Sequence, residues 1–202
     1  MKLYFKPGAC SLASHIVLEE SGSSFELEKV DTQTKLTESN KNYLTINPKG
    51  YVPALELSSG DTITEGPAIL QFLADKFSDK NLLPGTGTIE RTKVIESLTY
   101  TSSELHKAFS PLFKSDTSDE AQSRAKASVA EKFDFIEQLL ADDREFIVGG
   151  QFSIADAYLF VVCNWSNFVG IPLNNWPKLE AYLFRIAQRP SVQRAMKSEG
   201  LI

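Results

Sequence analysis

The chain begins with MKLYFKPGACSLASHIVLEE (residues 1–20), the stretch on which the prediction of the fold depends. Residues 2–5 alternate polar and apolar side chains, which is the pattern of a short strand. A Pro-Gly break follows at residues 7–8, and apolar residues then recur at helical spacing to the end of the stretch. The sequence therefore predicts a strand that passes directly into a helix, with Cys10 at the junction.

This position makes Cys10 a candidate for a reactive thiol. The backbone N–H groups at the start of a helix are unpaired, and the positive end of the helix dipole lies there. Both favour the thiolate and predict a lowered pKa. The alternative is a buried free cysteine that serves as a small apolar filler. Position alone leaves the two interpretations equally open.

Composition indicates a globular chain, since 42% of its 202 residues are hydrophobic and 23% are charged. A net charge of −5 argues against nucleic acid as the main partner, because no surplus of basic residues is present to bind phosphates. No window approaches the roughly 20 apolar residues of a membrane span. With no apolar leader and only Cys10 and Cys163, we expect a cytoplasmic chain with free thiols.

The first 80 residues predict an α/β domain. The segment around residues 40–44 suggests a short irregular helix, and a further helix is expected from Glu65 onward, with Pro67 suited to its first turn. A helical crossover joins the first two strands in parallel, and a hairpin pairs the last two antiparallel. Residues 1–80 are thus expected to form a mixed four-stranded sheet with strands at residues 2–5, 25–28, 54–57 and 62–64.

The remainder of the chain predicts helices only. Residues 81–88 have the composition of a linker, and residues 89–202 carry apolar side chains at helical spacing. Ser153 and Asp156 have the spacing of a helix N-terminal cap, and the run after them is apolar almost all round. Such a helix belongs in the middle of a bundle. We therefore expect an all-α helical bundle as the C-terminal domain.

The sequence contains no pattern typical of a metal site or of a phosphate-binding site. The two histidines, His15 and His106, are far apart in the sequence, and no Cys/His cluster has the spacing of metal ligands. No glycine-rich phosphate loop is present. No second cysteine follows Cys10, so a Cys-x-x-Cys dithiol is excluded, whereas exchange through a single thiol is not.

The order of elements and three motifs resemble a glutathione transferase, in which a thioredoxin-like N-terminal domain precedes an all-α domain. Residues 47–55 (NPKGYVPAL) resemble the segment that carries a cis-proline in that superfamily. Residues 64–70 (TEGPAIL) resemble its γ-glutamyl-binding turn, and residues 152–156 (FSIAD) its buried N-capping box. Each match alone is weak, and jointly they are specific.

Two further features resemble the bacterial beta class of that family. They are residues 6–11 (KPGACS) and the pair His106-Lys107. Taken together, the matches run from the first strand to the sixth predicted helix and cover most of the chain.

The resemblance implies where glutathione binds. The backbone of Val52, beside a cis Pro53, would pair with the cysteinyl unit. Glu65 would pair with the α-ammonium group, while the N–H groups of the helix after it hold the γ-glutamyl carboxylate. Gly66 departs from the serine or threonine common there, so its backbone N–H must serve alone. Further expected contacts are Lys35 (to the glycyl carboxylate), Tyr51, Ser103, Glu104 and Lys107.

Many members of the family stabilise the glutathione thiolate with a tyrosine of the first strand. The matching position here is Phe5, and strand alternation directs Tyr4 to the opposite face of the sheet. Tyrosine activation is therefore not expected. The catalytic candidates that remain are Cys10, Ser11 and His106.

The function implied by the resemblance is conjugation by a cytosolic homodimer without a cofactor. The thiolate of glutathione would attack a small apolar electrophile, held between the domains near Phe5 and Trp165, and the partner chain would contribute to the glutathione site. Core packing is an equal alternative for Trp165. One rival function is a glutathione-dependent thiol–disulfide oxidoreductase or peroxidase with Cys10 as nucleophile. Another is a non-catalytic binding protein of the same fold.

Overall fold

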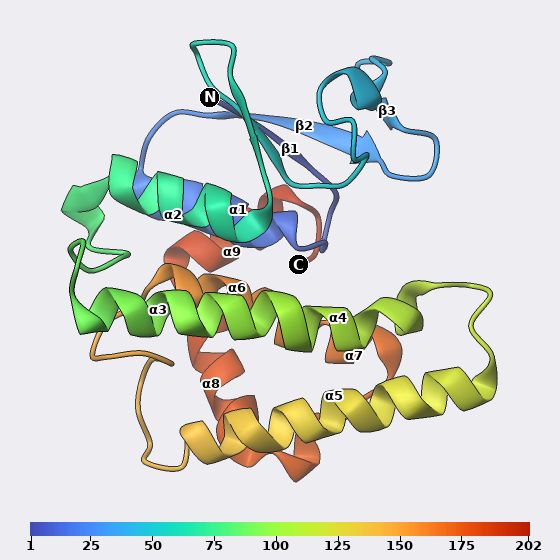
Figure 1. Cartoon of the computed structure of the whole chain (residues 1–202), viewed down its shortest axis with the longest axis vertical. Coiled ribbons are helices and arrows are strands. Elements are labelled where there is room, and N and C mark those ends of the chain that lie inside the picture. Colours follow the sequence, from blue (N-terminus) through green and yellow to red (C-terminus); the bar gives the residue numbers. More distant parts are fainter. The chain divides into compact units, whose positions relative to one another are not determined.

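The computed structural model describes all 202 residues, which form two compact units. Unit 1 consists of Met1–Leu83 together with Arg189–Ile202, and unit 2 consists of Pro84–Gln188. Figure 1 labels their helices and strands. No helix combines the length and the apolar character needed to cross a membrane.

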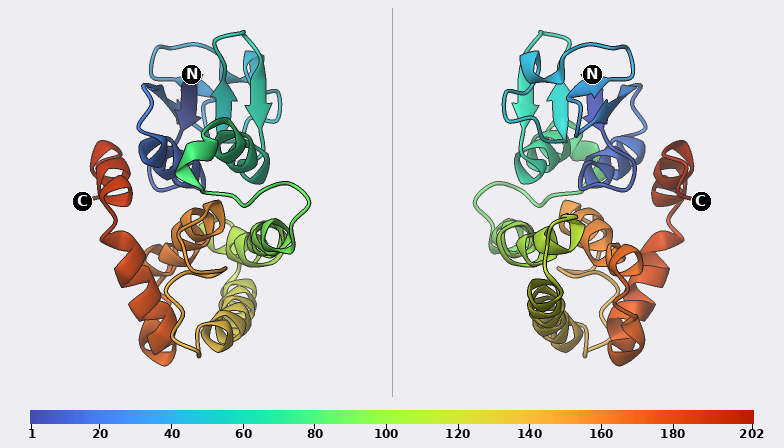
Figure 2. Two further views of the ribbon diagram at one scale, coloured as in Figure 1. Left: turned by 90° about the vertical axis from the view of Figure 1, so that its left-hand side faces the viewer. Right: turned by 90° about the vertical axis from the view of Figure 1, so that its right-hand side faces the viewer.

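Unit 1 is built on a mixed five-stranded sheet with the strand order β3-β2-β1-β4-β5. β1 (Lys2–Phe5) pairs in parallel with β2 (Glu26–Asp31) and antiparallel with β4 (Ala54–Glu56), which pairs antiparallel with β5 (Thr62–Thr64). These pairings confirm the predicted crossover and hairpin. The crossover helix α1 (Ser11–Ser21) and the helix after β5, α2 (Gly66–Lys76), lie side by side against one face of the sheet (Figures 1 and 2).

The sheet of unit 1 has five strands, one more than the predicted four. β3 (Leu36–Thr37) pairs antiparallel with the end of β2, which continues three residues past its predicted end at residue 28. A two-residue strand shows no alternation, so the sequence carries no periodic signal for it. The short helix expected around residues 40–44 is present as a 3-10 turn, η1 (Tyr43–Thr45).

The side chains of β1 alternate between the two faces of the sheet, as expected for a strand. The Phe5 ring faces α1, with its centroid 6.2 Å from that of His15. Tyr4 packs on the other face, where its ring centroid lies 5.7 Å from that of Tyr43. The prediction that these two aromatic residues face opposite ways is confirmed.

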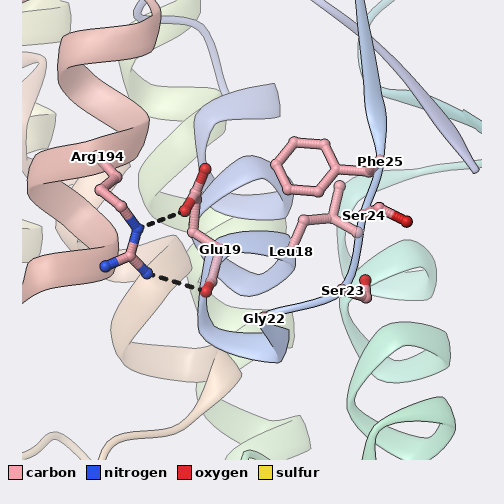
Figure 3. Close-up of a pocket in the computed structure, with 7 residues that line it drawn as sticks. All are labelled: Leu18, Glu19, Gly22, Ser23, Ser24, Phe25 and Arg194. Carbon is pink, nitrogen blue, oxygen red and sulfur yellow. Dashed lines mark hydrogen bonds and ion pairs between the residues drawn. The ribbon is translucent and has the colours of Figure 1, made fainter.

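The C-terminal helix α9 (Pro190–Ser198) packs on α1 and belongs to unit 1, which differs from the predicted C-terminal domain of residues 89–202. Arg194 Nε donates to a carboxylate oxygen of Glu19 over 2.6 Å, beside an open hollow at the end of α1 (Figure 3). An amphipathic pattern predicts a helix, but it does not say which partner the apolar face will meet.

A buried carboxylate, that of Glu199 just after α9, adds to the contact between α9 and the first part of unit 1. Glu199 accepts hydrogen bonds from His15 Nδ1 and from the Gly8 backbone N–H, both at 2.9 Å. The side chains of Glu199 and His15 are fully buried. Because Gly8 lies two residues before Cys10, the end of the chain holds the loop that leads to the cysteine.

Unit 2 is a helical bundle, as predicted. Its central helix α6 is buried from Ile154 to Cys163, in agreement with the apolar run. The Ser153–Asp156 capping box is formed, and the Asp156 carboxylate also accepts from the Tyr182 hydroxyl at 2.9 Å. The α-helices are α3 (Ile89–Tyr100), α4 (His106–Phe109), α5 (Asp119–Leu139), α6 (Ile154–Asn164), α7 (Ser166–Val169) and α8 (Pro177–Ala187).

Candidate active site

The candidate residues of unit 1 meet where β1 leads into α1 and where β4 begins. Cys10 is the N-terminal cap residue of α1, and its thiol donates to the carbonyl oxygen of Val52 over 3.3 Å. The peptide bond between Val52 and Pro53 is cis, as the motif of residues 47–55 predicted. The structure therefore brings Cys10 next to the peptide expected to bind the cysteinyl unit of glutathione.

Two buried side chains hold the chain just before Val52, and the sequence reasoning did not single them out. The Tyr43 hydroxyl donates to the Tyr51 carbonyl oxygen over 2.8 Å, and Asn47 Nδ2 donates to the same oxygen over 2.7 Å. The N–H of Val52 has no acceptor within the chain. Asn47 opens the motif of residues 47–55, but the motif does not say where the amide of its side chain points.

Lys35 and Tyr51 lie together beside this peptide. Lys35 Nζ donates to the Gly50 carbonyl oxygen over 3.0 Å and lies 5.8 Å from the centroid of the Tyr51 ring, which is 71% exposed. Gly50 has a φ of 69°, and an added Cβ would lie 3.2 Å from Leu44 and from Lys35. Only glycine allows both this backbone conformation and this close approach.

Glu65 immediately precedes α2 in a backbone conformation that residues other than glycine rarely adopt, with φ 72° and ψ 117°. Its carboxylate is exposed and lies 2.5 Å from Lys49 Nζ, a cation that the sequence analysis did not predict at this site. The neighbouring Gly66 has an ordinary backbone conformation, and an added Cβ would meet no atom within 4 Å. The site would therefore accommodate the hydroxyl residue that is common at this position in the family.

The predicted low pKa of Cys10 is wrong. The pKa of this thiol is raised to about 11, mainly by burial and in smaller part by the nearby Glu65 carboxylate. The backbone N–H groups of Cys10 and Ser11 lower the pKa, but they do not offset the loss of solvent. The thiol is therefore protonated at neutral pH and is a poor nucleophile, which argues against thiol–disulfide exchange through Cys10.

Neither hydroxyl near the cysteine is available to a substrate. Ser11 is fully buried, and its Oγ accepts from the Lys6 N–H over 3.2 Å and donates to the Lys6 carbonyl over 3.3 Å. Ser11 Oγ therefore closes the loop before the cysteine, and its catalytic role stays a prediction. The Tyr4 hydroxyl donates to Glu56 over 2.6 Å, in agreement with the prediction that no tyrosine of β1 activates the thiol.

The two aromatic residues predicted to line an electrophile pocket are packed inside their units. Phe5 is 6% exposed and faces α1, and Trp165 is 5% exposed. The Trp165 ring packs edge-on against Phe109 and Phe113, with centroids 5.7 and 5.3 Å away. The packing alternative left open for Trp165 is therefore favoured, and the same interpretation applies to Phe5.

In unit 2, His106 follows a π-helical turn, Thr101–Leu105, that joins α3 to α4. Its Nδ1 lies 2.8 Å from the Tyr158 hydroxyl, and its ring packs edge-on against Trp165 with the centroids 4.7 Å apart. Burial, helped by the nearby Lys107 ammonium, lowers the pKa of His106 to about 4, so the imidazole is neutral at pH 7. Neither the π-helical turn nor the Tyr158 contact had a signal in the sequence.

The other predicted residues of this segment lie at the surface. Ser103, Glu104 and Lys107 are exposed. Ser103 Oγ donates to the carbonyl of Thr99 over 2.9 Å, and Glu104 lies 3.8 Å from Lys132. The structure thus groups these three residues on one stretch of helix with His106.

Comparison with known proteins gives consistent matches along the chain. Residues 8–76 match the N-terminal domain of glutathione S-transferases, and residues 100–190 match the C-terminal domain. The glutathione S-transferase GstA of Escherichia coli O157:H7 is 47% identical over 201 residues, with both chains fully covered.

Solved structures agree with these sequence matches. A bacterial beta class glutathione S-transferase from Sphingomonas chungbukensis superimposes with a TM-score of 0.97 at 49% identity, and both chains are fully covered. A sphingomonad glutathione S-transferase in complex with glutathione gives a TM-score of 0.96 at 47% identity over the full length of both chains.

Proposed function

This chain belongs to the glutathione S-transferase family, in its bacterial beta class, and we propose that it conjugates glutathione to small apolar electrophiles at the site assembled around Val52. The observation that carries the proposed site is the peptide backbone of Val52. Its N–H has no acceptor within the chain, and its carbonyl oxygen accepts only the weak thiol donor of Cys10. A cysteinyl backbone would satisfy both groups as an antiparallel strand does.

The γ-glutamyl end of glutathione would bind at the start of α2. The Gly66 N–H has no acceptor within the chain, and the first turn of a helix favours a carboxylate. The exposed carboxylate of Glu65 faces the α-ammonium group, which would compete with Lys49 for it. Lys35, already beside Gly50, would reach the glycyl carboxylate.

In unit 1 we propose Cys10 as the group that stabilises the glutathione thiolate, and His106 of unit 2 stays a catalytic candidate by resemblance alone. Ser11 and Tyr4 are committed to Lys6 and Glu56, as described above. Cys10 contributes a protonated S–H group and the backbone N–H groups around it. In this mechanism the attacking sulfur belongs to glutathione, and Cys10 provides a polar environment for it.

The remaining features follow the family. The active form is a homodimer whose partner chain contributes to the glutathione site, with Tyr51, Ser103 and Glu104 at the surface of each chain. The enzyme acts in the cytoplasm and needs no cofactor, because glutathione itself supplies the nucleophile. The electrophile is small and apolar.

Calorimetric titration with glutathione tests this site. Glu65→Gln keeps the shape of the side chain and removes its charge, so glutathione binding should weaken by about 1.5–3 kcal/mol, the usual range for a hydrogen bond to a charged group. The free energy of unfolding should change by no more than about 1 kcal/mol, because the pair with Lys49 is exposed.

The matched control is Glu120→Gln, which removes an exposed carboxylate paired with Arg124 on α5. It should leave both glutathione affinity and conjugation of chlorodinitrobenzene unchanged. Equal glutathione affinity in wild type and Glu65→Gln would remove Glu65 from the site. Absence of conjugation by the wild-type enzyme would contradict the proposed function itself.

A further inference from the structure

Lys49 lies in the turn before the Val52 peptide and reaches the residue that precedes α2. Its Nζ donates to Thr64 Oγ1 over 2.9 Å and lies 2.5 Å from a carboxylate oxygen of Glu65. Its backbone N–H donates over 3.2 Å to Oδ1 of Asn47, the buried residue whose amide also holds the chain before Val52. The lysine is thus joined to both ends of the proposed glutathione site within unit 1.

Folding stability does not account for this contact. The side chain of Lys49 is 50% exposed and that of Glu65 is 67% exposed, and ion pairs at such positions contribute little to stability. Holding a lysine side chain in one geometry also has an entropic cost. A lysine that did nothing else would weaken glutathione binding, because it occupies the carboxylate that the α-ammonium group needs.

The γ-glutamyl end of glutathione carries the same two charges as the Lys49–Glu65 pair. Its α-ammonium and α-carboxylate groups are bonded to one carbon atom. An ammonium group on Glu65 therefore brings a carboxylate close to Lys49 Nζ, which has just lost its own partner. One ion pair becomes two with no change in net charge, so the exchange offsets the competition between the two cations.

We propose that Lys49 is a specificity-determining residue that exchanges Glu65 for the α-carboxylate of the γ-glutamyl unit when glutathione binds. The α-ammonium group then takes the place of Lys49 on Glu65. The inference rests on the proposed function and goes beyond it, because it assigns a charged side chain to this carboxylate. It also makes the site selective for a γ-glutamyl end that carries both charges.

The chain around the pair suits this exchange. Glu65 is held at φ 72° and ψ 117°, a backbone conformation that its surroundings must fix. Lysine carries a compact charge on a flexible stem, so Nζ can change partners while its backbone stays bonded to Asn47. Gly66 offers the start of α2 a backbone N–H and no hydroxyl, so the lysine supplies a second donor there.

Calorimetry with two ligands tests the exchange. Lys49→Gln should weaken glutathione binding by about three- to tenfold, between the effects of an exposed ion pair and of a charged hydrogen bond. The second ligand is γ-aminobutyryl-cysteinylglycine, which is glutathione without its α-carboxylate. It should bind Lys49→Gln at least as tightly as wild type, because the lysine no longer competes for Glu65 and no carboxylate is lost to it.

The two ligands therefore respond in different directions if the proposal holds. Equal weakening of both would mean that the lysine acts only through the structure of the site. Equal or tighter glutathione binding in Lys49→Gln would mean that the lysine is only a competitor. Either result would overturn the exchange. Lys49→Arg keeps the charge and should retain most of the glutathione affinity, whereas Lys41→Gln, at another exposed lysine of unit 1, should leave both affinities unchanged.

A double variant separates this inference from the proposed function. In the Glu65→Gln background, Lys49→Gln should still weaken glutathione binding, because the lysine contacts the ligand itself. No further loss in that background would show that Lys49 acts only by placing Glu65, and would overturn the exchange. Failure of Glu65→Gln alone to weaken binding would instead contradict the proposed glutathione site.

Discussion

The thiol of Cys10 donates a hydrogen bond to the carbonyl oxygen of Val52 over 3.3 Å, which joins the start of α1 to the peptide before Pro53. The same carbonyl is the acceptor proposed for the cysteinyl N–H of glutathione. Because burial keeps the thiol protonated at neutral pH, it would meet glutathione at the proposed site as a weak donor and not as a competing nucleophile.

The first prediction separates conjugation from thiol exchange. Cys10→Ala should keep a substantial part of the conjugating activity, losing less than about 100-fold, which is the edge of the range for an essential proton-transfer group. Any glutathione-dependent disulfide reductase activity should disappear, because no second cysteine lies in unit 1. Initial rates with chlorodinitrobenzene and with a mixed disulfide test both statements, and loss of conjugation with glutathione still bound would contradict them.

The raised pKa of Cys10 has its own test. Alkylation of the free enzyme by iodoacetamide should accelerate through the alkaline range toward pH 11, since only the thiolate reacts. Cys163 is fully buried and should stay unmodified, which intact mass spectrometry of Cys10→Ala would establish. A rate that levels off below pH 8 would show that the thiol has a low pKa after all.

The second prediction concerns Gly66. Gly66→Ser should tighten glutathione binding by about 0.5–1.5 kcal/mol, the net value of one added hydrogen bond. The backbone of Gly66 is ordinary and the space around it is open, so the free energy of unfolding should stay near that of wild type.

The matched control for that substitution is Gly50→Ser. Gly50 has a φ of 69° and close neighbours at 3.2 Å, so this variant should lose both stability and glutathione affinity. Calorimetry and thermal unfolding measure the two quantities. If Gly66→Ser weakened binding, the γ-glutamyl carboxylate would have to lie elsewhere.

The third prediction concerns the buried contact of Glu199 with His15 and Gly8 in unit 1. Glu199→Ala leaves His15 and the Gly8 N–H without their acceptor, so it should lower the free energy of unfolding by about 3–5 kcal/mol, as expected for breaking a buried pair. Glu180→Ala, at an exposed position of α8, should change it little. Urea unfolding compares the two variants, and similar midpoints would contradict a stabilising role for Glu199.

The fourth prediction follows from the lowered pKa of His106. The folded value of about 4 lies below the ordinary 6.5, so between these pH values the unfolded chain binds more protons than the folded chain. The stability that this group contributes is therefore present above pH 6.5 and is lost as the pH falls to 4. The difference in free energy of unfolding between wild type and His106→Gln should shrink over this window by up to about 3 kcal/mol.

Thermal and denaturant unfolding at several pH values measure that difference, and the comparison with the variant cancels the carboxylates that titrate in the same range. At pH 7 to 8 the difference should be constant. A difference that stays constant down to pH 4 would mean that His106 titrates normally.

Much of unit 1 could be predicted because its signals lie in contiguous residues. Alternation placed β1 at Lys2–Phe5 and β5 at Thr62–Thr64 with their observed bounds, and the Pro67 signal placed α2. The resemblance of residues 47–55 placed the cis bond before Pro53. β3 was missed because two residues show no period.

What the sequence by itself determined is therefore the order of the main elements, the parallel crossover and the hairpin of unit 1, the family, and which residue types stand at the candidate site. The tertiary structure alone decided the chemical state of those residues. The helix start at Cys10 is local and favours the thiolate, but burial by distant residues outweighs it and raises the pKa to about 11. The Tyr158 contact with His106 and the Glu199 contact with His15 likewise join residues far apart in the chain, so no local pattern contains them.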